Sequence, residues 1–354
     1  MTDTLTLTRP DDWHLHFRDG GMLHETVPAT AMTFRRAIVM PNLTPPVVRT
    51  ADARAYRERI LAAVPQGVDF EPLMVLYLTD ATTPDDIAEA AASGIVYGCK
   101  LYPAGATTNS DSGVRDPSQI MALYEAMEKH GLPLQVHGEV TESHIDIFDR
   151  EMLFIDRYLL DIRRRFPALK IIFEHVTTRE GVQFVQDHDT LTAATVTPQH
   201  LMMNRNDLLA GGIRPHNYCL PVLKRREHQE SIQAAVLAGD TRFFLGTDSA
   251  PHARNRKEAA CGCAGCYSAP AAMPLYATFF EEHGKLDRLE GFASHYGPDF
   301  YGLPRNTDTI TLERSEWAVP QHIEADGTTL VPWQAGVLLP WRATSRSAHP
   351  PRQQ

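Results

Sequence analysis

The sequence lacks the features of a membrane or secreted protein. Its longest apolar runs reach only about seven residues, whereas a membrane-spanning helix needs about 20. The N-terminal residues MTDTLTLTRPDDW contain no basic region followed by an apolar stretch, as a secretory signal would. The five cysteines are odd in number and three of them crowd into CGCAGC, which does not fit a secreted disulfide framework. We therefore expect a cytoplasmic protein with no membrane partner.

An excess of basic residues is also lacking. Lys and Arg total 34 against 44 Asp and Glu, and the resulting formal charge of −10 argues against a broad phosphate-binding surface. Nucleic acid is therefore not an expected partner. Hydrophobic residues make up 43% of the 354 residues, which is the proportion of an ordinary globular protein with a large core.

The sequence has no Gly-rich phosphate-binding turn after its first apolar segment, which counts against a doubly wound sheet. It does have short apolar segments that alternate with segments of helical spacing. The apolar segments that are candidate strands are WHLHF (13–17), AIVMP (37–41), PLMVLYL (72–78), IVYGCKLY (95–102), PLQVHGE (133–139), KIIFEHV (170–176), LTAATVTPQH (191–200) and RFFLGTDSAPH (242–252). Eight such strands separated by helices predict an α/β protein with the (β/α)8, or TIM barrel, fold. The doubly wound sheet is the alternative.

The chain is predicted to form one domain over residues 1–340, because no internal repeat or long linker interrupts it. The part after about residue 285 is less regular and is expected to pack across the barrel. The last residues, 341–354, are predicted to be a polar, disordered tail.

Charged and metal-ligating residues end or interrupt several of these apolar strands. They are His14, His16, Lys100, His137, His175 and Asp248. In a barrel the C-terminal ends of all strands surround one opening, so residues far apart in the chain can share a site. Four histidines and an aspartate are enough ligands for two ions, and their chemistry suits zinc or a similar first-row metal.

Three of these residues have alternative interpretations. His14 and His16 lie two apart on a strand and point to one face, so both can bind one ion, but strand histidines are also found simply hydrogen-bonded. Lys100 is either an ammonium paired with a carboxylate, or a neutral amine that reacts with carbon dioxide to give an anionic carbamate ligand.

The clustered cysteines, Cys261, Cys263 and Cys266, raise the question of a second, structural zinc site. Such a site needs four ligands and usually a second spaced pair, whereas Cys99 and Cys219 are single and distant in sequence. A tight Gly-rich loop is the simpler interpretation.

The arrangement of motifs resembles a known family. The segments that carry the resemblance are RPDDWHLHFRDG, MPNLTPP, GCKLYPAGATTNS, VHGE, FEHVTT, PHNYCLPVLK, GTDSAPH and CGCAGC. Together they resemble the dihydroorotases of the bacterial-type, single-domain class, within the amidohydrolase superfamily. The resemblance extends from residue 9 to about residue 266 or further, with no departure at a position that carries chemistry.

The resemblance implies a binuclear centre with two Zn²⁺ per subunit. Its ligands would be His14, His16 and Asp248 on one ion and His137 and His175 on the other, with N6-carboxylated Lys100 as the bridge. Members of this class commonly form homodimers, so a homodimer is expected here too.

The resemblance also implies a substrate site. Arg18, Asn42 and His252 would hold the substrate carboxylate, the backbones of Leu220 and Ala264 would contact the ring, and Thr107 and Thr108 would lie on a mobile lid.

Independent features of the sequence fit these roles. Arg18 follows His16 by two residues, and its planar fork can hold a carboxylate, although a surface salt bridge with Asp19 is the alternative. The segment PAGATTNSDSGVRD (103–116) is long and rich in Gly, Ser and Thr, as a lid or a merely mobile loop would be. Outside this context His252 would be an ordinary loop histidine.

The expected reaction is the reversible cyclisation of N-carbamoyl-L-aspartate to L-dihydroorotate, a step of de novo pyrimidine (UMP) biosynthesis. Two metals would lower the pKa of a bridging water, and the resulting hydroxide would attack the ring carbonyl in the hydrolytic direction. Asp248 would take the proton from the hydroxide and deliver it to the departing ring nitrogen.

Two other functions compete with this one. Another cyclic amidohydrolase, acting on hydantoins or allantoin, could use the same ligands, but such enzymes generally carry a long segment before the histidine pair. Arg18 and Asn42 also specify a carboxylate that simple hydantoins lack. A non-catalytic barrel scaffold would be expected to have lost ligands, and none is missing here.

Overall fold

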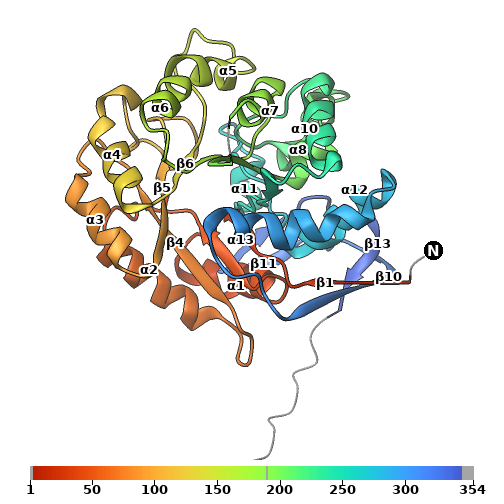
Figure 1. Ribbon diagram of the computed structural model, residues 1–354. Coiled ribbons are helices and arrows are strands. Elements are labelled where there is room, and N and C mark those ends of the chain that lie inside the picture. The colour runs from red at the N-terminus through yellow and green to blue at the C-terminus, as the bar shows by residue number, and fades with distance from the viewer. Residues whose placement is uncertain (1–2, 189, 345–354) are drawn as a thin grey trace, which may run out of the picture.

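The computed structural model describes residues 3–188 and 190–344, in which eight parallel strands surround a common axis (Figure 1). In chain order they are β2 (Asp12–Leu15), β3 (Arg36–Val39), β4 (Glu71–Tyr77), β5 (Val96–Leu101), β6 (Leu134–Val136), β7 (Ile171–Phe173), β8 (Thr192–Val196) and β9 (Phe243–Leu245). Each pairs with the next one along the chain, and each overlaps one of the segments predicted from the sequence.

The sheet closes where its last strand meets its first. Just beyond β9, the backbone N–H of Asp248 donates to the carbonyl of His14 at 2.8 Å, and the N–H of His16 donates to the carbonyl of Ser249 at 2.9 Å. An open, doubly wound sheet would leave these two edges apart. The prediction of a (β/α)8 barrel is confirmed.

Helices surround the barrel and connect its strands (Figure 1). They are α1 (Leu23–Ala31), α2 (Thr50–Ala63), α3 (Pro84–Ala92), α4 (Met121–His130), α5 (Arg150–Phe154), α6 (Leu160–Arg165), α7 (Arg179–Gln186), α8 (Pro198–Met202), α9 (Arg205–Leu209), α10 (Arg226–Ala238), α11 (Arg254–Lys257), α12 (Ala272–Glu282) and α13 (Tyr296–Tyr301). Local sequence sets their limits: Thr83 and Asp86 form a capping box at the start of α3, and Gly131 ends α4 in the left-handed conformation at φ 70°.

Aromatic side chains fill the N-terminal end of the barrel. Trp13 from β2 stacks on Tyr301 from α13 with ring centroids 4.5 Å apart, and Phe244 from β9 meets Trp13 edge-on at 6.2 Å. A Cβ atom on Gly297 would lie 1.9 Å from the Trp13 indole nitrogen, so only glycine lets α13 approach this closely. Helix α13, within the segment after residue 285, thus closes this end of the barrel.

A second sheet lies beside the barrel and was not predicted from the sequence. It contains β1 (Thr4–Thr8), β10 (Thr309–Ala318) and β13 (Leu338–Ala343) in antiparallel order, and β11 (Ile323–Ala325) and β12 (Thr328–Leu330) form a separate hairpin. Trp341 of β13 is fully buried. The ordered chain therefore continues past the predicted boundary at residue 340, because this strand buries an aromatic side chain. Residues 345–354 of the expected tail lie outside the described residues.

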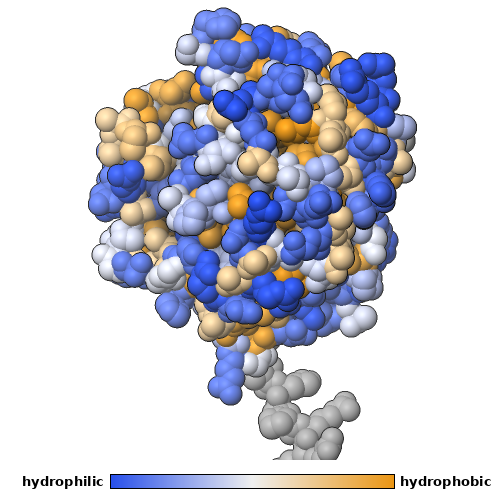
Figure 2. Space-filling view, turned by 90° about the vertical axis from the view of Figure 1, so that its left-hand side faces the viewer, coloured by the Kyte–Doolittle hydropathy of each residue, from blue (hydrophilic) through white to orange (hydrophobic). Residues whose placement is uncertain are grey.

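The outer surface is mixed in character. Figure 2 shows one face on which hydrophilic residues predominate and apolar residues form scattered patches. Over the part of the chain that the structure describes, no helix has the length and apolar character needed to cross a membrane.

Candidate active site

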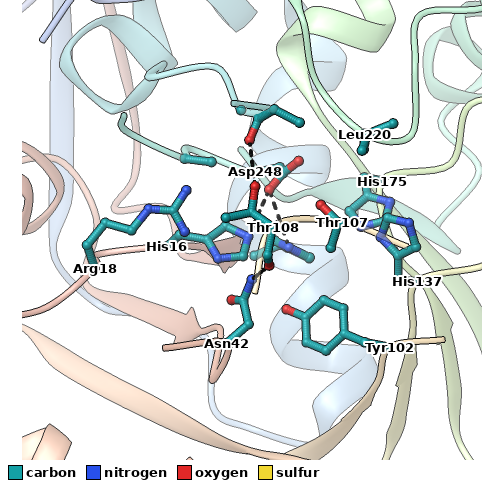
Figure 3. Close-up of a pocket in the computed structure, with 14 residues that line it drawn as sticks. His16, Arg18, Asn42, Tyr102, Thr107, Thr108, His137, His175, Leu220 and Asp248 are labelled. Carbon is teal, nitrogen blue, oxygen red and sulfur yellow. Dashed lines mark hydrogen bonds and ion pairs between the residues drawn. The ribbon is translucent and has the colours of Figure 1, made fainter. Parts of the chain in front are cut away.

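A pocket lined mainly by polar side chains opens at the C-terminal end of the barrel (Figure 3). The predicted site residues that line it are His14, His16, Arg18, Asn42, Thr107, Thr108, His137, His175, Leu220, Asp248 and Ala264. The other two predicted residues adjoin it: the Lys100 ammonium lies 5.2 Å from the ring centroid of Tyr102, which also lines the pocket, and His252 contacts Arg18. The fold therefore brings together all the residues selected from the sequence.

Three of these residues form a group that could hold a metal ion. One ligand atom from each of His14, His16 and Asp248 lies within 4.8 Å of the others. The Asp248 Oδ1 atom lies 3.1 Å from His16 Nε2 and 3.5 Å from His14 Nε2. Two imidazoles and a carboxylate are a donor set that suits zinc and related first-row metals.

A second pair of histidines faces this group across the pocket (Figure 3). The ring centroids of His137 and His175 are 4.9 Å apart, and that of His175 is 5.0 Å from His14. Among the described residues, the buried Nδ1 atom of His175 and the buried Nζ atom of Lys100 have no hydrogen-bond partner. Buried polar atoms are normally paired, so these two orphaned atoms fit a bound group that would supply their missing partners, as a metal centre would.

Burial and neighbouring groups together set the pKa values of these residues. It lowers the pKa values of His14 and His175 well below their usual range, which favours the neutral imidazole that binds metals. It lowers the pKa of Lys100 to about 8, although Glu174 and Asp248 favour the ammonium. Burial also opposes ionisation of Asp248, but the hydrogen bond from His16 and the nearby histidines lower its pKa to about 2.

The backbone turns sharply at three of the site residues. Arg18, His175 and Asp248 have φ values of 63°, 40° and 45°, in the left-handed region that side chains other than glycine rarely adopt. Each follows the end of a barrel strand, where the turn directs the side chain into the pocket (Figure 3). Such strained conformations concentrate at functional sites, where the surrounding fold has to maintain them.

Two glutamates that sequence reasoning missed orient the histidines. His14 Nδ1 donates to Glu174 Oε2 at 2.7 Å, and His137 Nε2 donates to Glu139 Oε2 at 2.7 Å. Each bond leaves the other ring nitrogen free for a ligand role, the usual arrangement for metal-binding histidines. The signal was present in the sequence, since both glutamates stand within two residues of a selected histidine in FEHV and VHGE.

A cationic corner lies beside the metal-ligating group. Arg18 Nη2 is 2.8 Å from His252 Nε2, and Arg18 Nε donates to the Pro251 carbonyl at 3.0 Å. Asp19 pairs instead with Arg59, at 2.7 Å, so the alternative of an Arg18–Asp19 salt bridge is wrong. The Arg18 guanidinium is therefore directed into the pocket (Figure 3).

The loop over residues 103–116 reaches across the pocket. Asn42 Nδ2 donates to the Thr108 carbonyl at 2.9 Å, and Asn109 Nδ2 donates to the Asn42 carbonyl at 3.0 Å. On the opposite side, Thr108 Oγ1 donates to the Ala264 carbonyl at 3.5 Å. Few hydrogen bonds to the rest of the site hold the loop tip, which suits a cover that opens and closes.

The cysteines of CGCAGC do not form a second metal group in the described part of the chain. Cys261 and Cys263 are 3.9 Å apart at their sulfur atoms, but the group of three or more ligands found in residues 3–188 and 190–344 is His14, His16 and Asp248. The interpretation as a tight loop fits Gly262 and Gly265, with φ values of 52° and 148°.

Comparison with known proteins agrees with this site. Residues 11–315 match the amidohydrolase family. The chain belongs to that family. It is 72% identical over 341 residues to a dihydroorotase of Alcanivorax borkumensis, covering 96% of this chain and 99% of the relative.

Two solved structures extend the agreement to the fold. A dihydroorotase from Saccharomyces cerevisiae in complex with 5-fluoroorotic acid has a TM-score of 0.90 at 34% identity, covering 97% of this chain and 99% of that one. A dihydroorotase from Campylobacter jejuni has a TM-score of 0.89 at 34% identity, covering 97% and 98%. Within the amidohydrolase family, the chain thus groups with the dihydroorotases, and the expected cyclic amide hydrolase class is confirmed.

Proposed function

We propose that the chain catalyses the reversible cyclisation of N-carbamoyl-L-aspartate to L-dihydroorotate. The observation that carries the proposal is the position of a cationic corner, Arg18 with His252, beside the His14, His16 and Asp248 group in one pocket. Ring opening needs a polarised carbonyl and an activated water, and the substrate carries a carboxylate that needs a cation. Simple hydantoins and allantoin carry no carboxylate, so enzymes that act on them do not need such a cation.

The metal-ligating residues would hold two zinc ions. His14, His16 and Asp248 would bind one, His137 and His175 the other, and N6-carboxylated Lys100 would bridge them. The buried, unpartnered Nζ of Lys100 supports this assignment, because a carbamate there would gain the partners that the amine lacks. When bound, the metal pair supplies the Lewis acidity that polarises the amide carbonyl and acidifies water.

The remaining residues would bind and orient the substrate. Arg18, Asn42 and His252 would hold its carboxylate, and the backbones of Leu220 and Ala264 would contact the ring. Asp248 lies between the two sides of the pocket, where its carboxylate would take a proton from the attacking water and deliver it to the departing ring nitrogen (Figure 3). Thr107 and Thr108 would close over the bound substrate and exclude bulk water.

The expected homodimer and cytoplasmic location stay predictions. Gel filtration with light scattering would test the first, and fractionation of the source cells would test the second.

The direct test is ring opening of L-dihydroorotate by purified, zinc-reconstituted protein, followed by loss of ultraviolet absorbance. Lys100→Ala, assayed with bicarbonate present, is the matched control, since it removes the bridging ligand without touching the substrate residues. Turnover by the wild type that vanishes in Lys100→Ala would support both the substrate and the carbamate. A fully metallated wild type that leaves dihydroorotate intact but opens hydantoin or allantoin would overturn the proposal.

A further inference from the structure

A buried ammonium group lies behind the substrate pocket, outside the set of residues given a role so far. Lys257 ends the short helix α11, and only 3% of the residue is exposed. Its Nζ atom donates to three backbone carbonyls: Tyr218 at 2.8 Å, Cys263 at 2.8 Å and Gly265 at 2.7 Å. An ammonium has three N–H donors, so this cation is fully paired despite its burial.

The three carbonyls belong to two separate segments of the pocket wall. Cys263 and Gly265 flank Ala264, and Tyr218 precedes Leu220 by two residues. The N–H of Gly265 also donates to the Tyr218 carbonyl, at 2.9 Å. Lys257 therefore ties together the two backbone segments, at Leu220 and Ala264, that the proposed function places against the substrate ring.

The segment held by Lys257 also connects to the carboxylate corner and the lid. The Ala264 carbonyl lies 2.9 Å from His252 Nε2 and accepts a hydrogen bond from Thr108 Oγ1. The segment has little freedom to move toward the barrel, because a Cβ atom on Gly265 would lie 2.5 Å from the Ala250 carbonyl oxygen. A shift of Ala264 would therefore disturb both the carboxylate site and the closed lid.

The positive charge of Lys257 reaches the same corner. Burial, Arg18 and Lys257 together lower the pKa of His252 to about 2. A cation whose field is felt at His252 also attracts the substrate carboxylate that this corner is expected to bind. This attraction is a second way in which Lys257 could act, and the variants below separate it from the effect of its three hydrogen bonds.

We propose that Lys257 is a positioning residue, whose three hydrogen bonds hold the Tyr218–Leu220 and Cys263–Gly265 segments at the separation that fits the substrate ring. The inference rests on the proposed function, because it takes Leu220 and Ala264 as the ring contacts. Lys257 itself does not touch the reacting atoms. Its loss should therefore weaken binding of the ring more than it slows the chemical step.

The test is a graded series at position 257 in the zinc-loaded protein. Lys257→Gln keeps fewer donors than the ammonium, and Lys257→Met keeps none. We expect KM for L-dihydroorotate to rise from wild type to Gln to Met, reaching at least about tenfold, while kcat stays within about threefold. The Kd of 5-fluoroorotic acid, measured by calorimetry, should rise in the same order. The inference is overturned if KM and Kd for Lys257→Met both stay within about twofold of the wild-type values.

Two further variants separate positioning from other effects. Lys170→Met removes a different lysine, which is partly buried and whose Nζ donates to the Phe300 carbonyl at the opposite end of the barrel. This variant should leave KM and Kd unchanged. Lys257→Arg keeps the charge, but a planar fork cannot converge on three carbonyls as an ammonium does, so it should bind weakly too. Full rescue by Arg would assign the effect to charge and contradict positioning. If Lys257→Met does not fold, the Gln and Arg variants decide the question.

The inference and the proposed function fail in different ways. A wild type that binds 5-fluoroorotic acid but does not open L-dihydroorotate would overturn the proposed function, while the Kd series would still test Lys257. An active wild type with Lys257 variants of unchanged KM and Kd would overturn the inference alone.

Discussion

The two ends of the barrel use the same strands in opposite ways. At the N-terminal end Trp13, Ile172 and Phe244 are fully buried against apolar neighbours, and Gln135 Nε2 donates to the Tyr301 hydroxyl at 2.7 Å. At the C-terminal end, one to four residues further along the same strands, the chain places His14, Glu174 and Asp248. The first end is packed mainly with aromatic and apolar side chains, although Trp13 Nε1 and Gln135 Oε1 have no partner there within the described part of the chain, and the second end gathers ionisable and metal-ligating groups.

This difference indicates that one end of the barrel mainly stabilises the fold and the other mainly forms the functional site. The N-terminal end contributes stability through aromatic packing and a helix that approaches closely at Gly297. The C-terminal end accepts strained backbones and a cluster of buried ionisable groups, both of which oppose folding. Substitutions at the C-terminal end should therefore affect activity first, and substitutions at the N-terminal end should affect stability first.

The largest effect on activity is expected at Asp248. Asp248→Ala removes a metal ligand and the proposed proton carrier, so kcat for ring opening should fall by about 10²-fold to 10⁴-fold or more. Turnover and the amount of bound metal should be measured on the same preparation. Near-normal turnover in a variant that retains its metals would show that Asp248 does not have this role.

Glu174 should have the next largest effect. Glu174→Gln weakens the acceptor for His14 Nδ1, and the loss of such an orienting partner typically costs about 10-fold to 100-fold in metal affinity or activity. Zinc affinity and kcat/KM should be measured together. Glu142→Gln is the matched control, since Glu142 pairs with Arg157 on the exposed surface. Equal zinc affinity and kcat/KM in the two variants would show that Glu174 does not orient His14 for metal binding.

A smaller effect is expected in the lid. Thr108→Val removes the hydroxyl that donates to the Ala264 carbonyl while keeping the shape of the side chain. One hydrogen bond contributes about 0.5–1.5 kcal/mol, so KM should rise by roughly twofold to tenfold. Thr329→Val, which removes an exposed hydroxyl bonded to Glu324, provides the comparison. A KM that is identical in both variants would mean that the closed lid does not help to bind substrate.

The smallest effect on activity is expected at Phe244, although its effect on stability is large. Phe244→Ala leaves a cavity among Trp13 and Tyr301 and should cost about 3–5 kcal/mol of unfolding free energy. The KM of the folded protein should stay close to that of the wild type. Denaturant titration and steady-state kinetics on the same preparation would check both expectations. A large rise in KM without loss of stability would break the proposed separation of the two ends.

The barrel could be predicted because its strands are buried on both faces. Such strands appear in sequence as short, nearly continuous apolar runs, and the polar residues that end them stand out clearly. The cluster of metal-ligating residues followed from one geometric rule, that parallel strand ends in a barrel meet at one opening, whereas the substrate and lid residues came from the family resemblance. His14, His175 and Asp248 could thus be placed together despite their separation in the chain.

The features that sequence reasoning missed depend on contacts distant in sequence. Strand β10 begins with the polar and apolar alternation of a half-buried strand, but its partner β1 lies near the other end of the chain, so the sequence did not show which segments form that sheet. Lys257 stands in RNRKEAA, which looks like a solvated basic segment, and only the fold places three carbonyls around its ammonium group. The burial of Trp341 likewise depends on the pairing of β13 with β10.

The most direct test of the account is the rate of L-dihydroorotate ring opening, measured against the amount of zinc bound per chain. If the C-terminal end of the barrel holds a bridged pair of ions, activity should rise to its maximum at two zinc ions per chain, and Lys100→Ala should bind less zinc and stay inactive. Full activity in metal-free protein, or in a Lys100→Ala variant with bicarbonate removed, would contradict the central claim.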